Sequence, residues 1–229
     1  MTSPETQNIQ KPPLAGLPLE ELTALLRDFP AYRAKQIYRW LKRAEADFNS
    51  MTDIPADFRL WLADNFSCRT SRLAESLHAA DGTQKARILL ADGAAIEAVL
   101  LSDGANRRTA CLSTQAGCPV GCIFCKTGSL GFKRNLISAE IVEQLYILSG
   151  GAVIDNIVLM GMGEPLDNFD NLTRFLALVS HPDGLCIGQR HISVSTCGLV
   201  DKIERLTEQK PQFTLSVSLH APNDKIRSE

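Results

Sequence analysis

Three cysteines, Cys118, Cys122 and Cys125, stand close together with C-x3-C-x2-C spacing. Thiolates are soft ligands, and three so near one another favour an iron–sulfur cluster or zinc. A structural zinc site needs four ligands, and no further Cys or His follows at a short spacing. Three thiolates on a 4Fe–4S cluster leave one iron free to bind a small molecule. The spacing therefore predicts a reactive metal centre, and a zinc knuckle or a chance grouping are the alternatives.

Several other residues have the chemistry to bind a ligand. Glycine allows a backbone to approach a ligand closely, and the carboxylate of Glu164 can accept hydrogen bonds from an ammonium group. Ser195 can donate to a carboxylate or a ribose, or it can cap a helix. His220 can contact a ligand or lie satisfied in a loop, and Phe124 can stack on a base or pack in the core. These residues fall in the segments 161–165 (Gly-Met-Gly-Glu-Pro), 195–198 (Ser-Thr-Cys-Gly) and 218–222 (Ser-Leu-His-Ala-Pro), and in the cysteine loop.

Alternating strands and helices place these segments together. The sequence predicts strands over 109–113, 156–161, 191–196 and 213–219, and helices over 139–149, 168–178 and 199–208. This alternation is typical of parallel βα units. In barrels of such units the active site lies at the carboxyl ends of the strands. The cysteine loop and the three segments all follow strands, so we expect them to converge on one face.

The first half of the chain has a different pattern. We expect a disordered tail over 1–16, a helical domain over 17–68, a β-hairpin linker region over 69–104 with Asp92-Gly93 at its turn, and the βα core over 105–229. The predicted helix 32–43 carries five basic residues and no acid, which fits either a solvated face or a phosphate-contacting face. Glu97 lies within a predicted strand, where a lone carboxylate usually faces solvent.

Composition narrows the class of protein. The chain has 229 residues, of which 45% are hydrophobic and 22% charged, with a net charge of −2, so the molecule as a whole is not a basic nucleic-acid binder. Its seven cysteines are odd in number and too clustered for a disulfide framework. With no secretory signal at the start, this favours a reducing cytoplasm. No apolar run is long enough to span a membrane.

The motifs together resemble the radical S-adenosylmethionine (SAM) superfamily. They are similar above all to the adenine carbon-2 RNA methyltransferases of the RlmN type, with the Cfr type as close kin. The matching stretches are Cys111-x-Ser-x-Gln115-x-Gly117-Cys118, Gly131-Phe132-x-Arg134-Asn135-Leu136, Ser195-Thr196-x-Gly198 and Ser218-Leu219-His220-Ala221-Pro222-Asn223-Asp224. Residues 32–40 and 48–55 also resemble the N-terminal accessory domain of that family.

The resemblance implies an α/β fold with a partial radical SAM (βα) barrel, and it implies a 4Fe–4S cluster and SAM as cofactors. Cys118, Cys122 and Cys125 would hold the cluster. Cys111 matches the resolving cysteine, which releases the product through a disulfide bond, and Glu97 matches the proton acceptor. The SAM site would be lined by Gly163, Glu164, Ser195, Ser218, Leu219 and His220.

The implied reaction methylates carbon 2 of a specific adenosine in 23S rRNA and in tRNA. One SAM methylates a cysteine near the C-terminus, and reductive cleavage of a second SAM yields the radical that activates this methyl group. An electron donor such as flavodoxin would serve a monomeric enzyme. Besides helix 32–43, the basic residues implied as RNA contacts are Arg107, Arg108, Lys126, Lys133 and Arg134.

The chain ends soon after the fourth predicted barrel strand, whereas the family continues for two more strand–helix units. Those units carry the methyl-accepting cysteine, and none of the seven cysteines here stands in that place. We therefore expect a truncated chain that cannot complete methylation alone. Two alternatives stay open, namely carbon-8 methylation as in the Cfr type and a remnant that only binds RNA.

Overall fold

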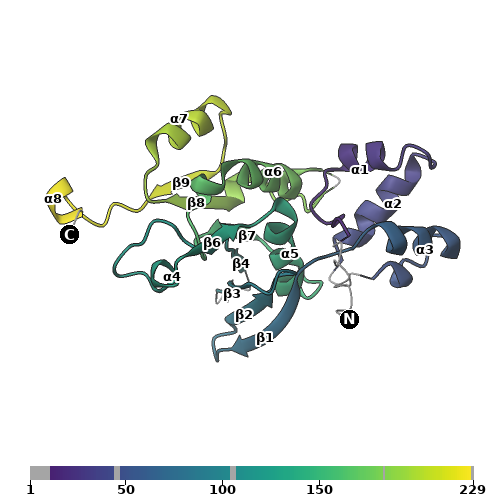
Figure 1. The fold of residues 1–229 in the computed structure, drawn as a ribbon, viewed down its shortest axis with the longest axis horizontal. Coiled ribbons are helices and arrows are strands. Elements are labelled where there is room, and N and C mark those ends of the chain that lie inside the picture. The colour runs from purple at the N-terminus through teal and green to yellow at the C-terminus, as the bar shows by residue number, and fades with distance from the viewer. Residues whose placement is uncertain (1–10, 44–46, 104–106, 183, 228–229) are drawn as a thin grey trace, which may run out of the picture.

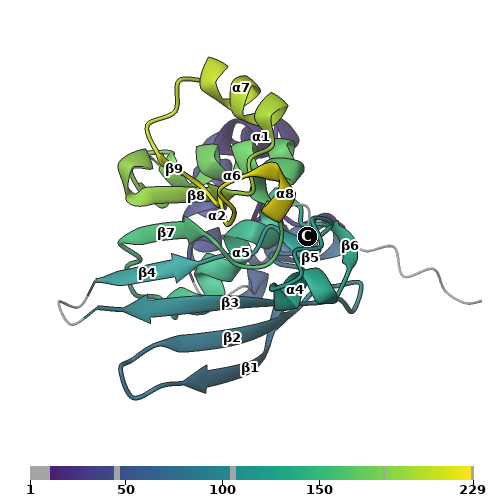
Figure 2. The same ribbon diagram turned by 90° about the vertical axis from the view of Figure 1, so that its left-hand side faces the viewer.

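The computed structural model describes residues 11–43, 47–103, 107–182 and 184–227. Its centre is a seven-stranded sheet in the order β1-β2-β3-β4-β7-β8-β9 (Figures 1 and 2). The strands are β1 (Arg72–His78), β2 (Gln84–Leu89), β3 (Ala95–Ser102), β4 (Arg108–Cys111), β7 (Asn156–Leu159), β8 (Ile192–Thr196) and β9 (Thr214–Val217). Strands β1 to β4 pair antiparallel, whereas β4, β7, β8 and β9 are parallel.

The parallel half of the sheet has the predicted strand–helix alternation. Helix α5 (Ser138–Ser149) precedes β7, α6 (Phe169–Ser180) precedes β8, and α7 (Val200–Glu208) precedes β9. The four parallel strands and their crossover helices form an open arc rather than a closed barrel. The expectation of a partial barrel with four strands is thus confirmed. Among the described residues, no helix is both long enough and apolar enough to cross a membrane.

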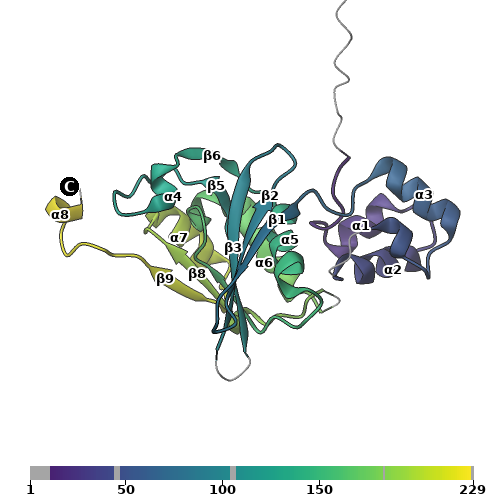
Figure 3. The ribbon, with the colours of Figure 1, turned by 90° about the horizontal axis from the view of Figure 1, so that it is seen from below.

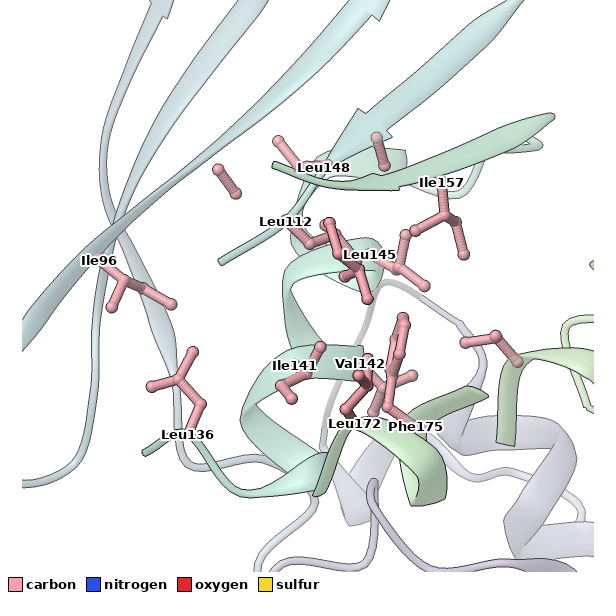
Figure 4. Close-up of a cluster of buried hydrophobic side chains, with 14 of the residues drawn as sticks. Ile96, Leu112, Leu136, Ile141, Val142, Leu145, Leu148, Ile157, Leu172 and Phe175 are labelled. Atoms are coloured by element: carbon pink, nitrogen blue, oxygen red, sulfur yellow. The ribbon is translucent and has the colours of Figure 1, made fainter. Parts of the chain in front are cut away.

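One face of the sheet packs against helices and forms the main core. Alternate residues of β2, β3, β7 and β8, such as Ile96 and Ala98 on β3, are almost completely buried. Figure 4 shows Leu112, Leu145 of α5 and Phe175 of α6 meeting in this layer. The period of two along each strand is what directs these side chains to a single face.

The opposite face of the sheet is open and mostly polar or small. Val99, Cys111, Val158 and Ser193 occupy one row across β3, β4, β7 and β8, because each is the register partner of the next. All four are only partly buried. This face corresponds to the interior of a barrel, and it bears Glu97 and Cys111, which the resemblance implicates in catalysis.

The predicted linker region 69–104 is in fact part of the main sheet. Strands β1, β2 and β3 form an antiparallel extension, and β3 pairs with β4 from Val99 to Ser102. The Asp92-Gly93 turn joins β2 to β3 as predicted. The hairpin joins the sheet through β4, which is the next strand along the chain and pairs antiparallel with β3.

The amino-terminal helices form a second unit with its own core. They are α1 (Leu19–Leu25), α2 (Tyr32–Leu41), a 3-10 turn at Phe48–Ser50 and α3 (Ala56–Asn65). Leu22, Ile37 and Leu62 are completely buried in this core. Figure 3 shows the unit at the end of the molecule opposite α8 (Asp224–Arg227).

The expected disordered tail 1–16 is wrong where the structure can be compared with it; residues 1–10 lie outside the described residues. Leu14 is completely buried, and its amide donates to the Ser67 carbonyl at 2.9 Å. A Cβ on Gly16 would lie 2.6 Å from the Cβ of Ala139 on α5. The apolar segment that follows the two prolines and contains Leu14 and Gly16 is therefore packed between the helical unit and the sheet unit.

Candidate active site

A small hairpin carries the cysteine loop. It consists of β5 (Gln115–Gly117) and β6 (Phe132–Asn135), which pair antiparallel, with the helical turn α4 (Lys126–Ser129) between them. Gly117 has a φ of +82°, and a Cβ on it would lie 1.8 Å from the Gly131 carbonyl oxygen. The Cys118 amide donates to that same carbonyl at 3.2 Å. The hairpin therefore holds the first of the three cysteines against the start of β6.

The three predicted cluster cysteines lie in one short turn-rich segment. The Cys125 amide donates to the Cys122 carbonyl at 3.0 Å, and the Cys125 carbonyl then accepts from Ser129 in α4. Burial raises the pKa of the Cys118 thiol, and the two neighbouring thiols act in the same direction. Within the described ranges, no three His, Cys, Asp or Glu side chains are arranged as a ready metal site. The donor set itself, three thiols on one loop, fits an iron–sulfur cluster.

A cleft of about 400 Å³ opens between the cysteine loop and the ends of β8 and β9. This volume is within the range of small-molecule sites, roughly 300–1,000 Å³. Cys122 and Phe124 line one side, and Cys197, Ser218 and His220 line the other. Three of the four segments that the sequence predicted to converge therefore share one cleft.

Contacts between the predicted residues join the two walls of this cleft. The Ser195 and Ser218 hydroxyls, at the ends of β8 and β9, lie 3.3 Å apart. The His220 ring contacts the Phe124 ring with centroids 4.8 Å apart. Ser195 thus does not cap α7, and Phe124, with 66% of its surface exposed, does not pack in the core. Leu219 is exposed beside them.

The Gly-Met-Gly-Glu-Pro segment lies beneath the cleft rather than in it. A Cβ on Gly163, whose φ is +104°, would lie 2.6 Å from the Cβ of Gln115. The close approach that we expected toward a ligand is therefore an approach to the protein's own β5. The Glu164 carboxylate is buried and accepts from the Leu166 amide at 3.0 Å and from the Cys197 amide at 2.7 Å.

Cys197 lines the cleft together with Cys122 and brings a further thiol near the cysteine loop. Burial first, and then the Glu164 carboxylate, raises the pKa of Cys197 to about 12. The Cys197 thiol therefore keeps its proton at neutral pH, unlike a thiolate ligand. The segment 195–198 was expected at the site, but the thiol of Cys197 had no expected role because it stands outside the C-x3-C-x2-C motif.

Glu97 and Cys111 lie on the open face of the sheet. Glu97 forms an ion pair with Lys85 at 2.8 Å, and Arg87 is its cross-strand partner on β2. Cys111 is opposite Val99, two residues along β3 from Glu97 and on the same face. Burial raises the pKa of the Cys111 thiol. All seven cysteines are free thiols, so Cys111 has no disulfide partner here.

Gln115 is a functional candidate that residue chemistry alone did not reveal. Its side-chain amide nitrogen donates to Asn135 and to Asp167, both at 2.8 Å, and its oxygen accepts from the Glu164 amide at 2.8 Å. Gln115 is completely buried. It therefore fastens the hairpin of the cysteine loop to the segment that carries Glu164. Its place in the matching motif was the available signal.

The basic residues expected to contact RNA have different surroundings. Arg134 is engaged by Glu140 through two hydrogen bonds of 2.7 Å and by Asp92 at 2.6 Å, so two carboxylates of the protein already compensate its charge. Arg107 is paired with Asp103 at 2.8 Å. Lys126 and Lys133 are exposed near the cysteine loop.

With this geometry in place, comparison with known proteins defines the class. Residues 112–229 match the radical SAM superfamily, and the chain belongs to it. The chain is 44% identical over 215 residues to the "Probable dual-specificity RNA methyltransferase RlmN" of Carboxydothermus hydrogenoformans. It is 44% identical over 241 residues to the protein of the same name from Heliobacterium modesticaldum. The resemblance seen in the motifs is thus confirmed.

A solved structure agrees. The crystal structure of a radical SAM methyltransferase from Sphaerobacter thermophilus matches with a TM-score of 0.89 and 39% identity, over 95% of this chain and 66% of that one. The matches to the Carboxydothermus and Heliobacterium proteins cover 92% and 98% of this chain. The chain spans 63% and 62% of the lengths of those two relatives.

Proposed function

We propose that the chain forms the cofactor-binding part of a radical SAM enzyme that methylates carbon 2 of an adenosine in 23S rRNA and tRNA. The observation that carries the proposal is the cleft in which the cysteine loop faces the ends of β8 and β9. Its walls hold three of the motifs that define the resemblance. The names of the relatives supply the RNA substrate class and the dual specificity.

Cys118, Cys122 and Cys125 would hold the 4Fe–4S cluster. A cluster bound there supplies the electron for reductive cleavage of SAM, which is chemistry of the cofactor rather than of the protein. The protein must then bind and orient SAM. The Ser195 and Ser218 hydroxyls lie at the cleft where they can donate to a carboxylate or a ribose, and the Phe124 ring with His220 offers an apolar wall.

Glu164 acts in this proposal mainly by shaping the site. Its two oxygens accept from backbone amides of its own segment and of the end of β8. A carboxylate oxygen has two acceptor positions, so each can still accept one further hydrogen bond from the ammonium group of a bound SAM. Glu164 thus supports the end of β8 through Cys197, and we propose that its remaining acceptor positions serve the ammonium group from beneath the cleft.

Glu97 and Cys111 would act later in the reaction. We assign Glu97 the proton that leaves carbon 2 of the adenine, because its carboxylate lies on the open face and Lys85 holds it there. We assign Cys111 the disulfide that releases the product, formed with a second cysteine of the enzyme. Both residues project from neighbouring strands into the space that a barrel encloses.

Anaerobic reconstitution with iron and sulfide tests the cofactor part. We expect the visible absorption of an iron–sulfur cluster, and cleavage of SAM to 5′-deoxyadenosine and methionine under a chemical reductant. Changing Cys118, Cys122 or Cys125 to Ala should abolish both, whereas Cys186→Ala, which removes an exposed thiol outside the cleft, should not. A colourless protein that binds zinc stoichiometrically would contradict the proposal.

Mass spectrometry of RNA tests the substrate part. RNA from cells that carry the gene should contain 2-methyladenosine that is lost when the gene is deleted. Appearance of 8-methyladenosine instead would favour a Cfr-type reaction. RNA binding that is unchanged by the three cysteine variants, together with no SAM cleavage by the unaltered protein, would favour a protein that only binds RNA.

A further inference from the structure

Backbone hydrogen bonding between β8 and β9 stops at the cleft, so another contact must hold the two strand ends together. The last backbone bond joins the Ser218 amide to the Thr196 carbonyl at 2.8 Å. Beyond it the chains leave the sheet toward Cys197 on one side and Leu219 on the other. The ends of β8 and β9 form the wall of the cleft that faces the cysteine loop, so their spacing sets the shape of that wall.

Arg227 joins these two chains. Its Nη1 donates to the Leu219 carbonyl at 2.6 Å, and its Nη2 donates to the Cys197 carbonyl at 2.7 Å. The two bonds come from one planar fork, which fixes the spacing of the acceptors as well as their distance. Short helix α8 presents the side chain, and Asn223 caps that helix by accepting from the Ile226 amide at 3.1 Å.

The residue after one of these carbonyls is held in an uncommon backbone conformation. His220 has a φ of +55°, a left-handed conformation that is unfavourable for a residue with a Cβ. This conformation places the ring of His220 against Phe124 of the cysteine loop. A bond to the carbonyl of Leu219 opposes relaxation of the next residue, and so it maintains the contact between the two walls.

The Arg227 fork also completes a series of hydrogen bonds across the strand ends. Gln115 beside the cysteine loop accepts from the Glu164 amide at 2.8 Å. Glu164 accepts from the Cys197 amide at 2.7 Å. The Cys197 carbonyl accepts from Arg227, which also reaches Leu219. The series thus runs from β5 through the Glu164 segment and the end of β8 to the end of β9.

We propose that Arg227 is a positioning residue for the SAM cleft, which it sets by fixing the distance between the ends of β8 and β9. The inference rests on the proposed function for the identity of the ligand. Arg227 acts through the Leu219 and Cys197 carbonyls and, through them, on His220 and Ser218. Charge alone does not do this, because the two carbonyls are engaged by two separate N–H groups.

The test uses Arg227→Ala, Arg227→Lys and the matched control Lys225→Ala, which removes one positive charge from the same helix. The first measurement is amide hydrogen exchange of the protein without cofactors, at Cys197, Gly198, Ser218 and Ala221. We expect exchange about tenfold faster in Arg227→Ala, the factor that corresponds to about 1.4 kcal/mol, and no change in Lys225→Ala. This measurement tests the tie even if the protein binds no SAM.

The second measurement is calorimetric binding of SAM to the reconstituted protein. Affinity should fall about tenfold in Arg227→Ala, stay lowered in Arg227→Lys and remain normal in Lys225→Ala. In SAM cleavage the KM should rise more than the kcat falls. Full recovery by Arg227→Lys would overturn the two-point tie, as would exchange rates in Arg227→Ala that equal those of the unaltered protein. Absence of SAM binding in the unaltered protein would contradict the proposed function and leave the exchange result to decide the tie.

Discussion

Cys111 shows how the setting of one side chain decides its reactivity. It lies on the open face of the sheet, yet it is partly covered by its neighbours, and burial disfavours its thiolate. The thiolate is the form that attacks a disulfide or an alkylating agent. In the proposed reaction, the raised pKa of Cys111 would keep its thiol protonated in the free protein.

Alkylation with iodoacetamide tests this protection. At pH 7 we expect Cys111 to react more slowly than the exposed Cys186, because less of its thiol is ionised and less of it is accessible. The Cys111 rate should keep rising as the pH is raised above the ordinary thiol pKa, since its own pKa is higher. Unfolding in urea should remove the difference. Equal rates of the two cysteines at pH 7, measured by mass spectrometry of the peptides, would contradict it.

Residue chemistry predicted which side chains gather at the cleft better than it predicted what each one touches. The cysteine loop, Ser218 and His220 meet there as expected. Glu164 and Gly163 were expected to face a ligand directly, but their contacts are largely with the chain itself. Local sequence does not show which long-range neighbour a polar group will find, so Gln115 and Arg227 had no predicted roles.

At the scale of elements, the β5–β6 hairpin is the frame of the cysteine loop. The close approach of its two strands depends on Gly117, because the Gly131 carbonyl lies in the space that a side chain on Gly117 would fill. Gly93 in the β2–β3 turn has the same φ of +82°, but a Cβ added to it would have nothing within 4 Å. A comparison of the two glycines thus distinguishes the cost of a left-handed backbone, which both positions carry, from the cost of a steric clash, which only Gly117 carries.

Replacing each glycine with alanine should give unequal losses of stability. Gly93→Ala carries only the cost of a left-handed alanine, roughly 1–2 kcal/mol. Gly117→Ala carries that cost and a backbone clash, so we expect at least about 2 kcal/mol more. Urea unfolding measures both, and iron content after reconstitution should fall for Gly117→Ala alone. Equal losses for the two variants would show that the hairpin can open at no cost.

A second element-scale tie is the ion pair between Arg134 of β6 and Glu140 of α5. The Glu140 side chain is only 5% exposed. Arg134→Ala leaves that buried carboxylate without its ion-pair partner and with the Ile137 amide, at 3.0 Å, as a remaining donor, which should cost roughly 3–5 kcal/mol. Arg107→Ala breaks the exposed pair with Asp103 and should cost less than about 1 kcal/mol. Urea unfolding of the two variants compares them, and similar small losses would mean that Glu140 is protonated or hydrated when unpaired.

How well an element could be predicted from the sequence depends on how far apart in the chain its interacting residues are. The helices and the parallel strands repeat local apolar periods, and they were predicted to within a few residues. The β5–β6 hairpin has three and four residues per strand and no local period, so it was not predicted. The packing of the segment around Leu14 depends on residues far along the chain, such as Ser67 and Ala139, which no local pattern contains.

At the scale of the whole molecule, the basic helix α2 is a candidate RNA surface. Cations in and just after this helix lie against aromatic rings, with Arg33 4.8 Å from the Tyr32 ring centroid and Arg43 3.8 Å from that of Trp40. Lys35 and Arg39 are exposed. These two side chains offer the charge that phosphates would contact, and such contacts make binding strongly salt-dependent.

The double variant Lys35→Ala with Arg39→Ala should weaken RNA binding and reduce its salt dependence by about two counterions. SAM binding should be unchanged, because α2 lies away from the cleft. The control Arg190→Ala with Lys210→Ala removes the same charge at the opposite ends of β8 and β9. Fluorescence anisotropy with a labelled RNA at several salt concentrations measures the affinity of each double variant and its dependence on salt. Equal effects of the two double variants would mean that α2 gives no specific surface.

The helical unit and α8 lie at opposite ends of the molecule, with the sheet between them (Figure 3). An RNA that touches α2 while it offers an adenosine to the cleft must therefore extend along most of the protein. The length that an RNA can span then becomes a criterion by which the protein would select its substrate. A short oligonucleotide carries the target base but cannot engage both ends at once, whereas a folded RNA brings distant phosphates and the target adenosine to the two ends together.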